Sequence, residues 1–406
     1  MTNSTKEVTS MLSQRCYDLG TARSVIRELF EYGKLRAAEV GADNVFDFSI
    51  GNPSVPPPPA VEETLERLLA TVDPLTLHGY TSAQGDFAVR QQLADSLSRR
   101  FGHPYDASQL YLTVGAAAAL CCVFHALTLP GDEYIVFAPY FPEYKVFLEG
   151  AGAKVNILPP KYPDFQIDLA ALDAALTPRT KGVLINSPNN PSGAVYTAET
   201  LTALGQLLAR RSQEYGHPIY LISDEPYREI VYGGVSTPWA PDFYPDTIVC
   251  YSYSKSLSLP GERIGYVLVG SEVADGERVY AAVAGAGRTL GYVNAPSLFQ
   301  RVAAECDGLC ADTSVYAQNR ELLTAELGKL GYDTSHPPQG TFYYFLPTLE
   351  PDDVAFCEKA KALDLLLVPG SGFGAPGYAR LSFCVPTRRI ARAIPVFAAL
   401  SKQYGR

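Results

Sequence analysis

A lysine surrounded by hydroxyl groups and an arginine is the most chemically distinctive feature of this sequence. Lys255 lies in the segment SYSKSLSLPGERIG together with Ser252, Ser254 and Arg263. The segment follows Thr247–Tyr251, whose β-branched and aromatic residues predict a buried strand. Since open α/β sheets bind ligands beyond the carboxyl ends of their strands, Lys255 is in a position to bond to a carbonyl cofactor. The serines and the arginine suit a phosphate, although most lysines are simply solvated surface charges.

Two further polar segments also follow predicted strands. Asn190 belongs to NSPNNPSG, in which two prolines and a glycine restrict the backbone and can hold a side-chain amide in one orientation. Asp224 and Tyr227 belong to SDEPY, where the carboxylate can pair with a buried cation such as a protonated ring nitrogen, and the tyrosine can donate to an oxyanion. The ordinary alternatives are an Asn-Pro turn and an aspartate that caps the next helix.

An anion site and a carboxylate site are also candidates. Gly115, Ala116 and Ala117 stand where a predicted strand gives way to a helix, and free backbone N–H groups at a helix N-terminus attract anions. Tight packing is the common alternative for such a turn. Arg380, in ARLSF on a predicted strand, suits a substrate carboxylate, for which a structural ion pair is the alternative.

The elements that must position these residues alternate between strand and helix. Strands are predicted at 110–114, 134–137, 154–157, 182–185, 219–223, 248–251 and 263–269. Helices are predicted at 24–40, 60–71, 87–101, 116–128, 143–151 and 198–215. This alternation indicates an α/β fold with a mostly parallel sheet that helices cover on both faces. Beyond Pro296 the pattern changes to a long helical stretch over 297–330, strands at 341–346, 366–369 and 380–384, and a helix at 352–362.

Length and composition limit the classes of function that are possible. With 406 residues, 47% hydrophobic and 19% charged, the chain is expected to form two domains with a sizeable core. The net charge of −10 argues against a nucleic-acid partner. Eight scattered cysteines and a polar Met1–Ser10 without a signal-peptide core indicate a cytoplasmic protein. No second pair accompanies Cys306 and Cys310, so no metal is expected, and Leu112–Leu129 is interpreted as a core segment and not a membrane span.

The order GAA, SPNNPSG, DEPY, SYSKSLSLPGERIGY and ARLSF resembles that of the class I aminotransferases, pyridoxal phosphate enzymes of the aspartate aminotransferase family and of fold type I. The resemblance covers nearly the whole chain, from Ile50 to Arg380. It implies a large pyridoxal phosphate-binding domain over 46–296. A smaller α+β domain would combine 1–45 with 297–406.

The resemblance implies a role for each motif. Lys255 would hold the cofactor as a Schiff base and later move a proton between the substrate α-carbon and the cofactor. Asp224 would keep the pyridine nitrogen protonated, while Asn190 and Tyr227 would contact the phenolate oxygen. The expected phosphate ligands are the turn of Gly115, Ala116 and Ala117 together with Ser252, Ser254 and Arg263.

Other residues match the family by position. Arg380 would bind the substrate α-carboxylate beside the backbone of Gly51, with Asn190 nearby. Phe141, in PYFPEY, matches the aromatic residue that stacks on the cofactor ring, with core packing as the alternative. Tyr80, in HGY, matches the tyrosine that reaches the phosphate of the neighbouring subunit, which implies a homodimer. Two departures from the family are alanines in the phosphate turn and Ser-Leu-Ser in place of the Asn-Phe-Gly that often follows the lysine.

The sequence leaves the substrate open. Dicarboxylate-specific members of this family bind the distal carboxylate with a second arginine, supplied by the partner subunit. The stretch GRTLGYVNAP, which contains Arg288, resembles the family segment that carries this arginine. Tyr292 and Asn294 are in register with that segment, and the stretch has one extra residue. Arg288 is therefore a candidate for reading an aspartate or glutamate side chain, and a surface or interface arginine is the alternative. Without it, an aromatic or aliphatic amino acid is the better expectation.

Other functions would use the same residues. A β-C–S lyase or a decarboxylase on this scaffold would share every cofactor residue, because fold and cofactor do not fix the reaction type. A regulatory module of a transcription factor fits less well, since no basic helix-turn-helix precedes Ser24. A structural role would leave Lys255, Asp224 and Arg380 unexplained together. The expectation is an aminotransferase that moves an amino group from an L-amino acid, of aspartate or glutamate type, to a 2-oxo acid.

Overall fold

The computed structural model describes residues 11–21 and 25–406. The polar segment Met1–Ser10 and Ser24, the first residue of an expected helix, lie outside the described residues. In the described part of the chain, no helix has both the length and the apolar composition needed to cross a membrane. The apolar stretch Leu112–Leu129 divides into the end of a strand and a buried helix.

The larger sheet has seven strands in these described residues, in the order β2-β8-β7-β6-β5-β3-β4. β8 runs antiparallel to both of its neighbours, and the remaining adjacent strands pair in parallel. The mostly parallel sheet and the α/β fold class predicted from the sequence are therefore confirmed. In chain order the strands are β2 (Leu110–Thr113), β3 (Glu133–Phe137), β4 (Lys154–Leu158), β5 (Thr180–Asn186), β6 (Tyr220–Asp224), β7 (Thr247–Ser252) and β8 (Gly265–Val269).

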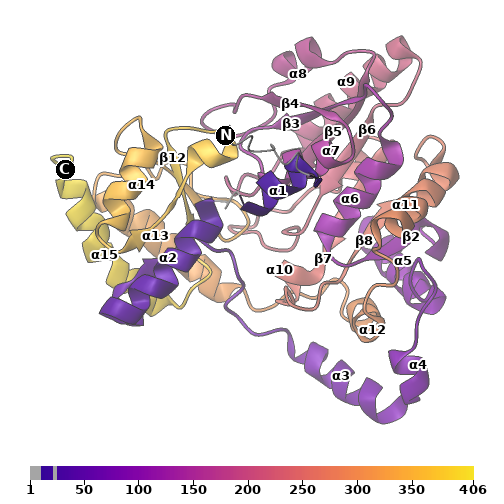
Figure 1. Ribbon diagram of the computed structural model, residues 1–406, viewed down its shortest axis with the longest axis horizontal. Coiled ribbons are helices and arrows are strands. Elements are labelled where there is room, and N and C mark those ends of the chain that lie inside the picture. Colours follow the sequence, from indigo (N-terminus) through magenta and orange to yellow (C-terminus); the bar gives the residue numbers. More distant parts are fainter. Residues whose placement is uncertain (1–10, 22–24) are drawn as a thin grey trace, which may run out of the picture.

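Helices cover both faces of this sheet (Figure 1). One face, which includes Ile222 and Ile248, packs against α6, α7 and α11. The opposite face, which includes the neighbouring residues Leu221 and Val249, packs against α5, α9 and α12. Because consecutive strand residues point to opposite faces, strands covered on both sides are apolar throughout. The helices around the sheet are α5 (Phe87–Phe101), α6 (Ala116–Leu127), α7 (Glu143–Gly150), α8 (Leu169–Ala175), α9 (Ala198–Tyr215), α11 (Gly276–Leu290) and α12 (Ser297–Glu305).

A smaller antiparallel sheet, β11-β12-β9, packs with α13, α14 and α15 around a separate core that includes Phe342, Phe356 and Phe397. β1 pairs in parallel with β10, so a segment from the N-terminal part of the chain joins this core. α2 also lies beside this C-terminal group (Figure 1). The predicted domain boundaries stay predictions. These elements are α2 (Val25–Val40), β1 (Phe46–Asp47), α13 (Ser314–Lys329), β9 (Tyr343–Pro347), α14 (Asp353–Lys361), β10 (Leu365–Leu366), β11 (Val368–Pro369), β12 (Tyr378–Ser382) and α15 (Thr387–Lys402).

The structure corrects some expected elements. The long helix expected over 297–330 is two helices, α12 and α13, and Gly308 between them has a φ of 82°, a left-handed conformation that a helix cannot continue through. Lys255 lies on the one-turn helix α10 (Tyr253–Ser256) and not on an open turn. Helix α3 (Pro59–Thr71) agrees with the expectation. Helices that the sequence pattern did not indicate are α1 (Gln14–Thr21), α4 (Pro74–His78), α8, α11 and α15.

Candidate active site

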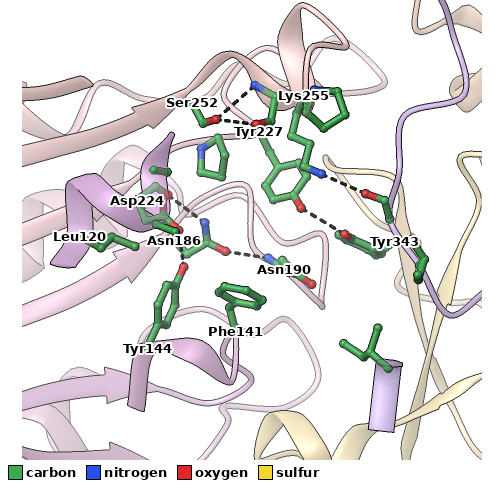
Figure 2. A pocket seen from close by; sticks show the side chains of 18 of the residues that line it. Leu120, Phe141, Tyr144, Asn186, Asn190, Asp224, Tyr227, Ser252, Lys255 and Tyr343 are labelled. Atoms are coloured by element: carbon green, nitrogen blue, oxygen red, sulfur yellow. Dashed lines mark hydrogen bonds between the residues drawn. The ribbon is translucent and has the colours of Figure 1, made fainter. Parts of the chain in front are cut away.

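The chemically distinctive residues of the sequence meet in one pocket of about 390 Å³ between the two sheets, a volume that suits a small molecule. The larger sheet contributes the carboxyl ends of β5, β6 and β7, and the smaller sheet contributes Tyr343 and Arg380. Figure 2 shows these side chains around a common space. The expected site residues that line the pocket are Gly51, Ala116, Ala117, Phe141, Asn190, Asp224, Tyr227, Ser252, Ser254, Lys255, Arg263 and Arg380.

Lys255 lies in the first turn after β7. Its Nζ donates a hydrogen bond to the carbonyl oxygen of Gly51 at 2.9 Å. Burial lowers the pKa of Lys255 from 10.5 to about 8; Cys384 opposes this shift, and the charges of Arg380 and Arg263 add to it. Because the lowered pKa makes the neutral amine available near neutral pH, Lys255 is suited to bond to a carbonyl carbon.

Asp224 ends β6, the strand that pairs in parallel with β7. Its Oδ2 accepts a 2.5 Å hydrogen bond from the hydroxyl of Tyr144, whereas its buried Oδ1 has no hydrogen-bond partner among the described residues. Burial raises the pKa of Asp224 to about 7; the Tyr144 hydrogen bond opposes this shift, and the charge of Glu225 adds to it. Leaving a buried carboxylate oxygen unpaired is costly, so a cationic group placed against Oδ1 would be stabilised.

Asn186 connects two strand ends to the loop that carries Asn190. Its Nδ2 donates to the backbone oxygen of Asp224 at 2.8 Å, and its Oδ1 accepts from the backbone N–H of Asn190 at 2.8 Å. The side chain of Asn190 in turn accepts a 3.1 Å hydrogen bond at Oδ1 from Nη1 of Arg380. All four residues are buried, so these contacts hold the Asn190 amide in one orientation at the pocket wall.

Arg380 brings a buried positive charge from β12 into the pocket. Its Nη2 donates to the backbone oxygen of Ser49 at 2.6 Å, while its Nε has no hydrogen-bond partner in the described part of the chain. The guanidinium carbon lies 4.5 Å from the ring centroid of Tyr343 and 4.9 Å from that of Phe373. Burial lowers the pKa of Arg380, yet a guanidinium stays charged in proteins. A carboxylate ligand would therefore find a charged, fixed partner here.

Tyr227 reaches the same pocket from the segment after β6. Its hydroxyl donates to the hydroxyl of Tyr343 at 3.2 Å, and the two rings meet edge to face with centroids 5.9 Å apart. Burial raises the pKa of Tyr227 well above 10, so the phenol stays protonated and can donate a hydrogen bond.

The turn at Gly115 leads from β2 into α6. Gly115 has a φ of 88°, in the left-handed region that favours glycine, and a Cβ there would lie 2.6 Å from Nη2 of Arg263. No side chain caps α6, so the backbone N–H groups of Ala116 and Ala117, which border the pocket, remain available to an anion.

Ser252, Ser254 and Arg263 surround the other side of this turn. The hydroxyl of Ser252 donates to that of Ser254 at 2.8 Å, and Nη1 of Arg263 donates to Ser254 Oγ at 3.4 Å. Nη2 of Arg263 donates to the backbone oxygen of Val114 at 3.2 Å. Two hydroxyls, an arginine and a helix N-terminus thus converge, which is a donor set that suits a phosphate.

Three expected site residues do not line the pocket of their own chain: Gly115, which directly precedes Ala116 of the lining, and the exposed Tyr80 and Arg288. Tyr80 is 97% exposed, and Arg288 is exposed near the end of α11. Both were expected to serve the site of a partner subunit, and these roles stay predictions. Phe141 lines the pocket with its ring edge-on to Tyr144, at a centroid distance of 5.6 Å, and its stacking role likewise stays a prediction.

Three polar residues of the pocket escaped the sequence reasoning: Asn186, Tyr144 and Tyr343. Asn186 is the first residue of the NSPNNPSG segment and the last residue of β5, and this strand-end position was the signal for it. Tyr144 lies in the first turn of α7, three residues after Phe141, and its nearness in sequence to the expected Phe141 could have drawn attention to it. Tyr343 has no local signal, because it enters the pocket from the smaller sheet.

The residues present fit pyridoxal phosphate, which carries an aldehyde, a phosphate, a phenolate oxygen and a pyridine nitrogen. Lys255 suits the aldehyde carbon, and the unpaired Oδ1 of Asp224 suits a protonated ring nitrogen. The hydroxyl of Tyr227 and the amide of Asn190 suit the phenolate oxygen. The donor set around Gly115 suits the phosphate. The buried and unpaired carboxylate oxygen is the observation that most directly calls for such a group.

Comparison with known sequences places these features in context. A family model described as "Aminotransferase class I and II" matches residues 43–397. An aspartate aminotransferase of Thermotoga maritima is 30% identical over 389 residues, which covers 95% of this chain and 97% of that protein. An aspartate/prephenate aminotransferase of Thermus thermophilus is 31% identical over 358 residues, which covers 86% of this chain and 89% of that protein.

Solved structures agree with the sequence comparison. An amino transferase from Eubacterium rectale superposes with a TM-score of 0.95 at 52% identity, covering 98% of this chain and all (100%) of that one. The aspartate aminotransferase of Thermus thermophilus with maleate has a TM-score of 0.82 at 28% identity, covering 97% and 100% of the two chains. At these coverages the similarity extends over both sheets.

Proposed function

The chain belongs to the aminotransferase class I and II family and is a pyridoxal phosphate-dependent aminotransferase, and from this premise we propose a role for each pocket residue. The observation that carries the assignment is the meeting of Lys255, whose pKa is lowered to about 8, with the unpaired carboxylate oxygen of Asp224 and the buried charge of Arg380. These three groups match the aldehyde, the ring nitrogen and a substrate carboxylate.

Lys255 is assigned both a holding and a proton-transfer role. When bound, the cofactor supplies an electron-accepting ring that stabilises negative charge at the substrate α-carbon. Lys255 would hold the cofactor through its aldehyde carbon, and the neutral amine of Lys255 would take and return the proton of the substrate α-carbon. The lowered pKa, about 8, supports this role, because a base is most effective when its pKa lies near the working pH.

The other residues bind and orient. Asp224 holds a proton on the ring nitrogen through Oδ1, and Tyr144 keeps the carboxylate in place through Oδ2. Tyr227 donates to the phenolate oxygen. Arg380 binds the substrate α-carboxylate, and its hydrogen bond to Asn190 fixes the guanidinium plane so that the α-carbon is presented to Lys255.

For the amino donor we propose L-aspartate or L-glutamate, with a 2-oxo acid as acceptor. The names of the similar proteins support this choice: aspartate aminotransferase in Thermotoga maritima and aspartate/prephenate aminotransferase in Thermus thermophilus. Arg288 is the proposed partner of the distal carboxylate. Since it is exposed and lies outside the pocket of its own chain, it would have to act in the site of a partner subunit.

An amino acid with an apolar side chain is the second candidate, favoured by the pocket wall. Ile26, Ile50 and Phe147 line the pocket alongside the cofactor-binding groups. The cations that line it, among the described residues, are Lys255, Arg263 and Arg380, and each already has another assignment. A chain acting without Arg288 would therefore favour an aromatic or aliphatic substrate.

We also propose a homodimer in the cytoplasm, with the large domain at 46–296 and the small domain formed by the rest of the chain. The exposed apolar side chains of Leu75, Tyr80 and Phe87, which lie close in sequence, support a subunit contact there. All eight cysteines are free thiols, which supports a reducing compartment. Light scattering of the purified protein tests the dimer, and cell fractionation tests the location.

The visible absorption spectrum of the purified protein, recorded with single amino acids and no 2-oxo acid, tests the function. We expect L-aspartate or L-glutamate to convert the bound cofactor to its pyridoxamine form. Conversion by aromatic or aliphatic amino acids only would favour the second candidate. Release of pyruvate and ammonia, or of carbon dioxide, with the band retained would indicate a lyase or a decarboxylase instead.

The role of Arg288 is tested separately. Arg288→Ala is expected to raise KM for L-aspartate at least tenfold and to leave KM for an apolar amino acid nearly unchanged, since only the dicarboxylate loses an ion pair. Arg278→Ala is the matched control, because Arg278 is an exposed arginine on the same helix, α11. Equal kinetics with L-aspartate in both variants would show that Arg288 does not bind the distal carboxylate.

A further inference from the structure

Tyr343 contacts several parts of the proposed machinery. It begins β9 and pairs with Ser382 on β12, the strand that carries Arg380. Its buried side chain accepts the hydrogen bond from the hydroxyl of Tyr227 and lies against the guanidinium of Arg380. It also explains why residue 51 is a glycine, since a Cβ on Gly51 would lie 1.9 Å from the Tyr343 hydroxyl oxygen.

The contact between Tyr343 and Tyr227 joins two separate parts of the fold. Tyr227 follows β6 of the larger sheet, whereas Tyr343 belongs to the smaller sheet. Figure 2 shows the two hydroxyls meeting beside Lys255, whose Nζ contacts the backbone of Gly51. The position of the smaller sheet is thereby linked to the hydroxyl that faces the cofactor.

The direction of this hydrogen bond must depend on what occupies the pocket. A phenol has one proton to donate and can also accept. Tyr227 donates that proton to Tyr343 in this structure, and Tyr343 has no second hydrogen-bond partner among the described residues. A hydrogen bond to an anion is roughly twice as strong as one between neutral groups, so a bound phenolate oxygen would attract the Tyr227 proton. Tyr343 would then donate to Tyr227 and strengthen its donation to the anion.

We infer that Tyr343 is a positioning residue, which polarises the hydroxyl of Tyr227 toward the cofactor and fixes the plane of Arg380 for the substrate carboxylate. The inference rests on the proposed roles of Tyr227 and Arg380. A hydrogen bond donated to the phenolate oxygen stabilises the bound cofactor most when the nitrogen that joins it to Lys255 has lost its proton, because the negative charge on the oxygen is then unbalanced. Loss of the Tyr343 hydroxyl therefore raises the pKa of that nitrogen.

The first test is a pH titration of the visible absorption band of the pyridoxal phosphate-loaded protein. Tyr343→Phe is expected to shift the midpoint upward by about half a pH unit, the size of effect expected for loss of one polarising hydrogen bond. KM for the amino donor is expected to change little, because the aromatic ring that lies against the Arg380 guanidinium remains in Tyr343→Phe.

Tyr344→Phe is the matched control. Tyr344 is the next residue of β9, is buried in the same core, and accepts a hydrogen bond from Thr324 at 3.3 Å on the face away from the pocket. Both variants lose one buried hydroxyl, so both should lower the melting temperature similarly. Only Tyr343→Phe should move the midpoint of the band.

A double-variant cycle decides whether Tyr343 acts through Tyr227. In a Tyr227→Phe background, adding Tyr343→Phe is expected to cause no further shift of the midpoint. An unchanged or lowered midpoint in Tyr343→Phe alone, or an equal shift in Tyr344→Phe, would overturn the role of Tyr343. So would an undiminished shift in the Tyr227→Phe background. A wild-type protein with no visible band, even after addition of pyridoxal phosphate, would instead contradict the proposed function itself.

Discussion

The hydroxyl of Tyr144, on α7, donates a 2.5 Å hydrogen bond to Oδ2 of Asp224, at the end of β6. The contact occupies one carboxylate oxygen and leaves Oδ1 free toward the pocket. Burial raises the pKa of Asp224 to about 7, and the hydrogen bond from Tyr144 limits that rise. Tyr144 therefore helps to keep Asp224 ionised, which is the form that can hold a proton on a ring nitrogen.

Removal of the Tyr144 hydroxyl should weaken cofactor binding most near neutral pH. In Tyr144→Phe the pKa of Asp224 rises further, so more of the carboxylate is protonated at pH 7. We expect the Kd of the cofactor-free protein for pyridoxal phosphate to rise about tenfold at pH 7, since a hydrogen bond to a charged group contributes about 1.5–3 kcal/mol. The difference should shrink at pH 9. Fluorescence titration measures both values, with Tyr140→Phe, in the segment just before α7, as control.

The charge of Lys255 should make the cofactor-free protein less stable below pH 8. Its pKa falls from 10.5 in the unfolded chain to about 8 in the folded state, so between these values the unfolded chain binds more protons. The free energy of unfolding therefore rises with pH from 8 to 10.5. Below pH 8 the folded protein bears the full cost of burying the charged amine. Lys255→Met should be more stable than the wild type by on the order of 2 kcal/mol at pH 7.

Urea unfolding at pH 7, 8.5 and 10 measures this effect. The advantage of Lys255→Met should decline as the pH rises and be smallest at pH 10. A constant advantage across the three values would show that the substitution acts through packing and not through the charge of Lys255.

Asn186→Ala should destabilise the protein and disturb substrate binding together. The substitution leaves the backbone oxygen of Asp224 and the backbone N–H of Asn190 without their buried partner. We expect a loss of about 2–6 kcal/mol in the free energy of unfolding, at about 1–3 kcal/mol for each of the two unpaired groups. KM for the amino donor should rise, because Asn190 orients Arg380. Asn156→Ala, on the exposed side of β4, should change neither quantity.

Arg380→Lys should raise KM for the amino donor strongly, although the substitution keeps the positive charge. The guanidinium donates to both Asn190 and Ser49 and keeps Nε for a ligand. A lysine offers one ammonium and cannot reproduce this planar arrangement. We expect kcat/KM to fall at least a hundredfold, or about 3 kcal/mol. Steady-state kinetics with Arg278→Lys as control measure the effect, and a fall below tenfold would contradict it.

Local sequence was sufficient to predict the strand-end half of the pocket. Asp224 and Lys255 each follow an apolar strand, and the carboxyl ends of parallel strands meet at one edge of a sheet. The turn at Gly115 is equally local, because a glycine before a helix provides both the backbone conformation and the free N–H groups. The positions of these residues are fixed by the strands that are adjacent to them in the sequence.

The other half of the pocket depends on contacts between distant segments. Tyr343 and Arg380 enter from a smaller sheet, and Gly51 reaches Lys255 through a segment next to β1. Nothing near Tyr343 in the sequence indicates that its hydroxyl meets that of Tyr227. The same holds for the division of the stretch 297–330 into two helices that pack in different cores.

The sequence by itself determined the α/β fold, the cofactor chemistry and the identity of Lys255, Asp224, Asn190, Arg263 and Arg380 as its candidate groups. Tertiary structure alone decided which oxygen of Asp224 stays unpaired, how far the pKa of Lys255 falls, and which side chains orient the others. The physical reason is that motif residues are placed by the backbone of one strand and one turn. Burial, charge and hydrogen-bond direction instead depend on every group within a few ångströms, whatever its position in the chain.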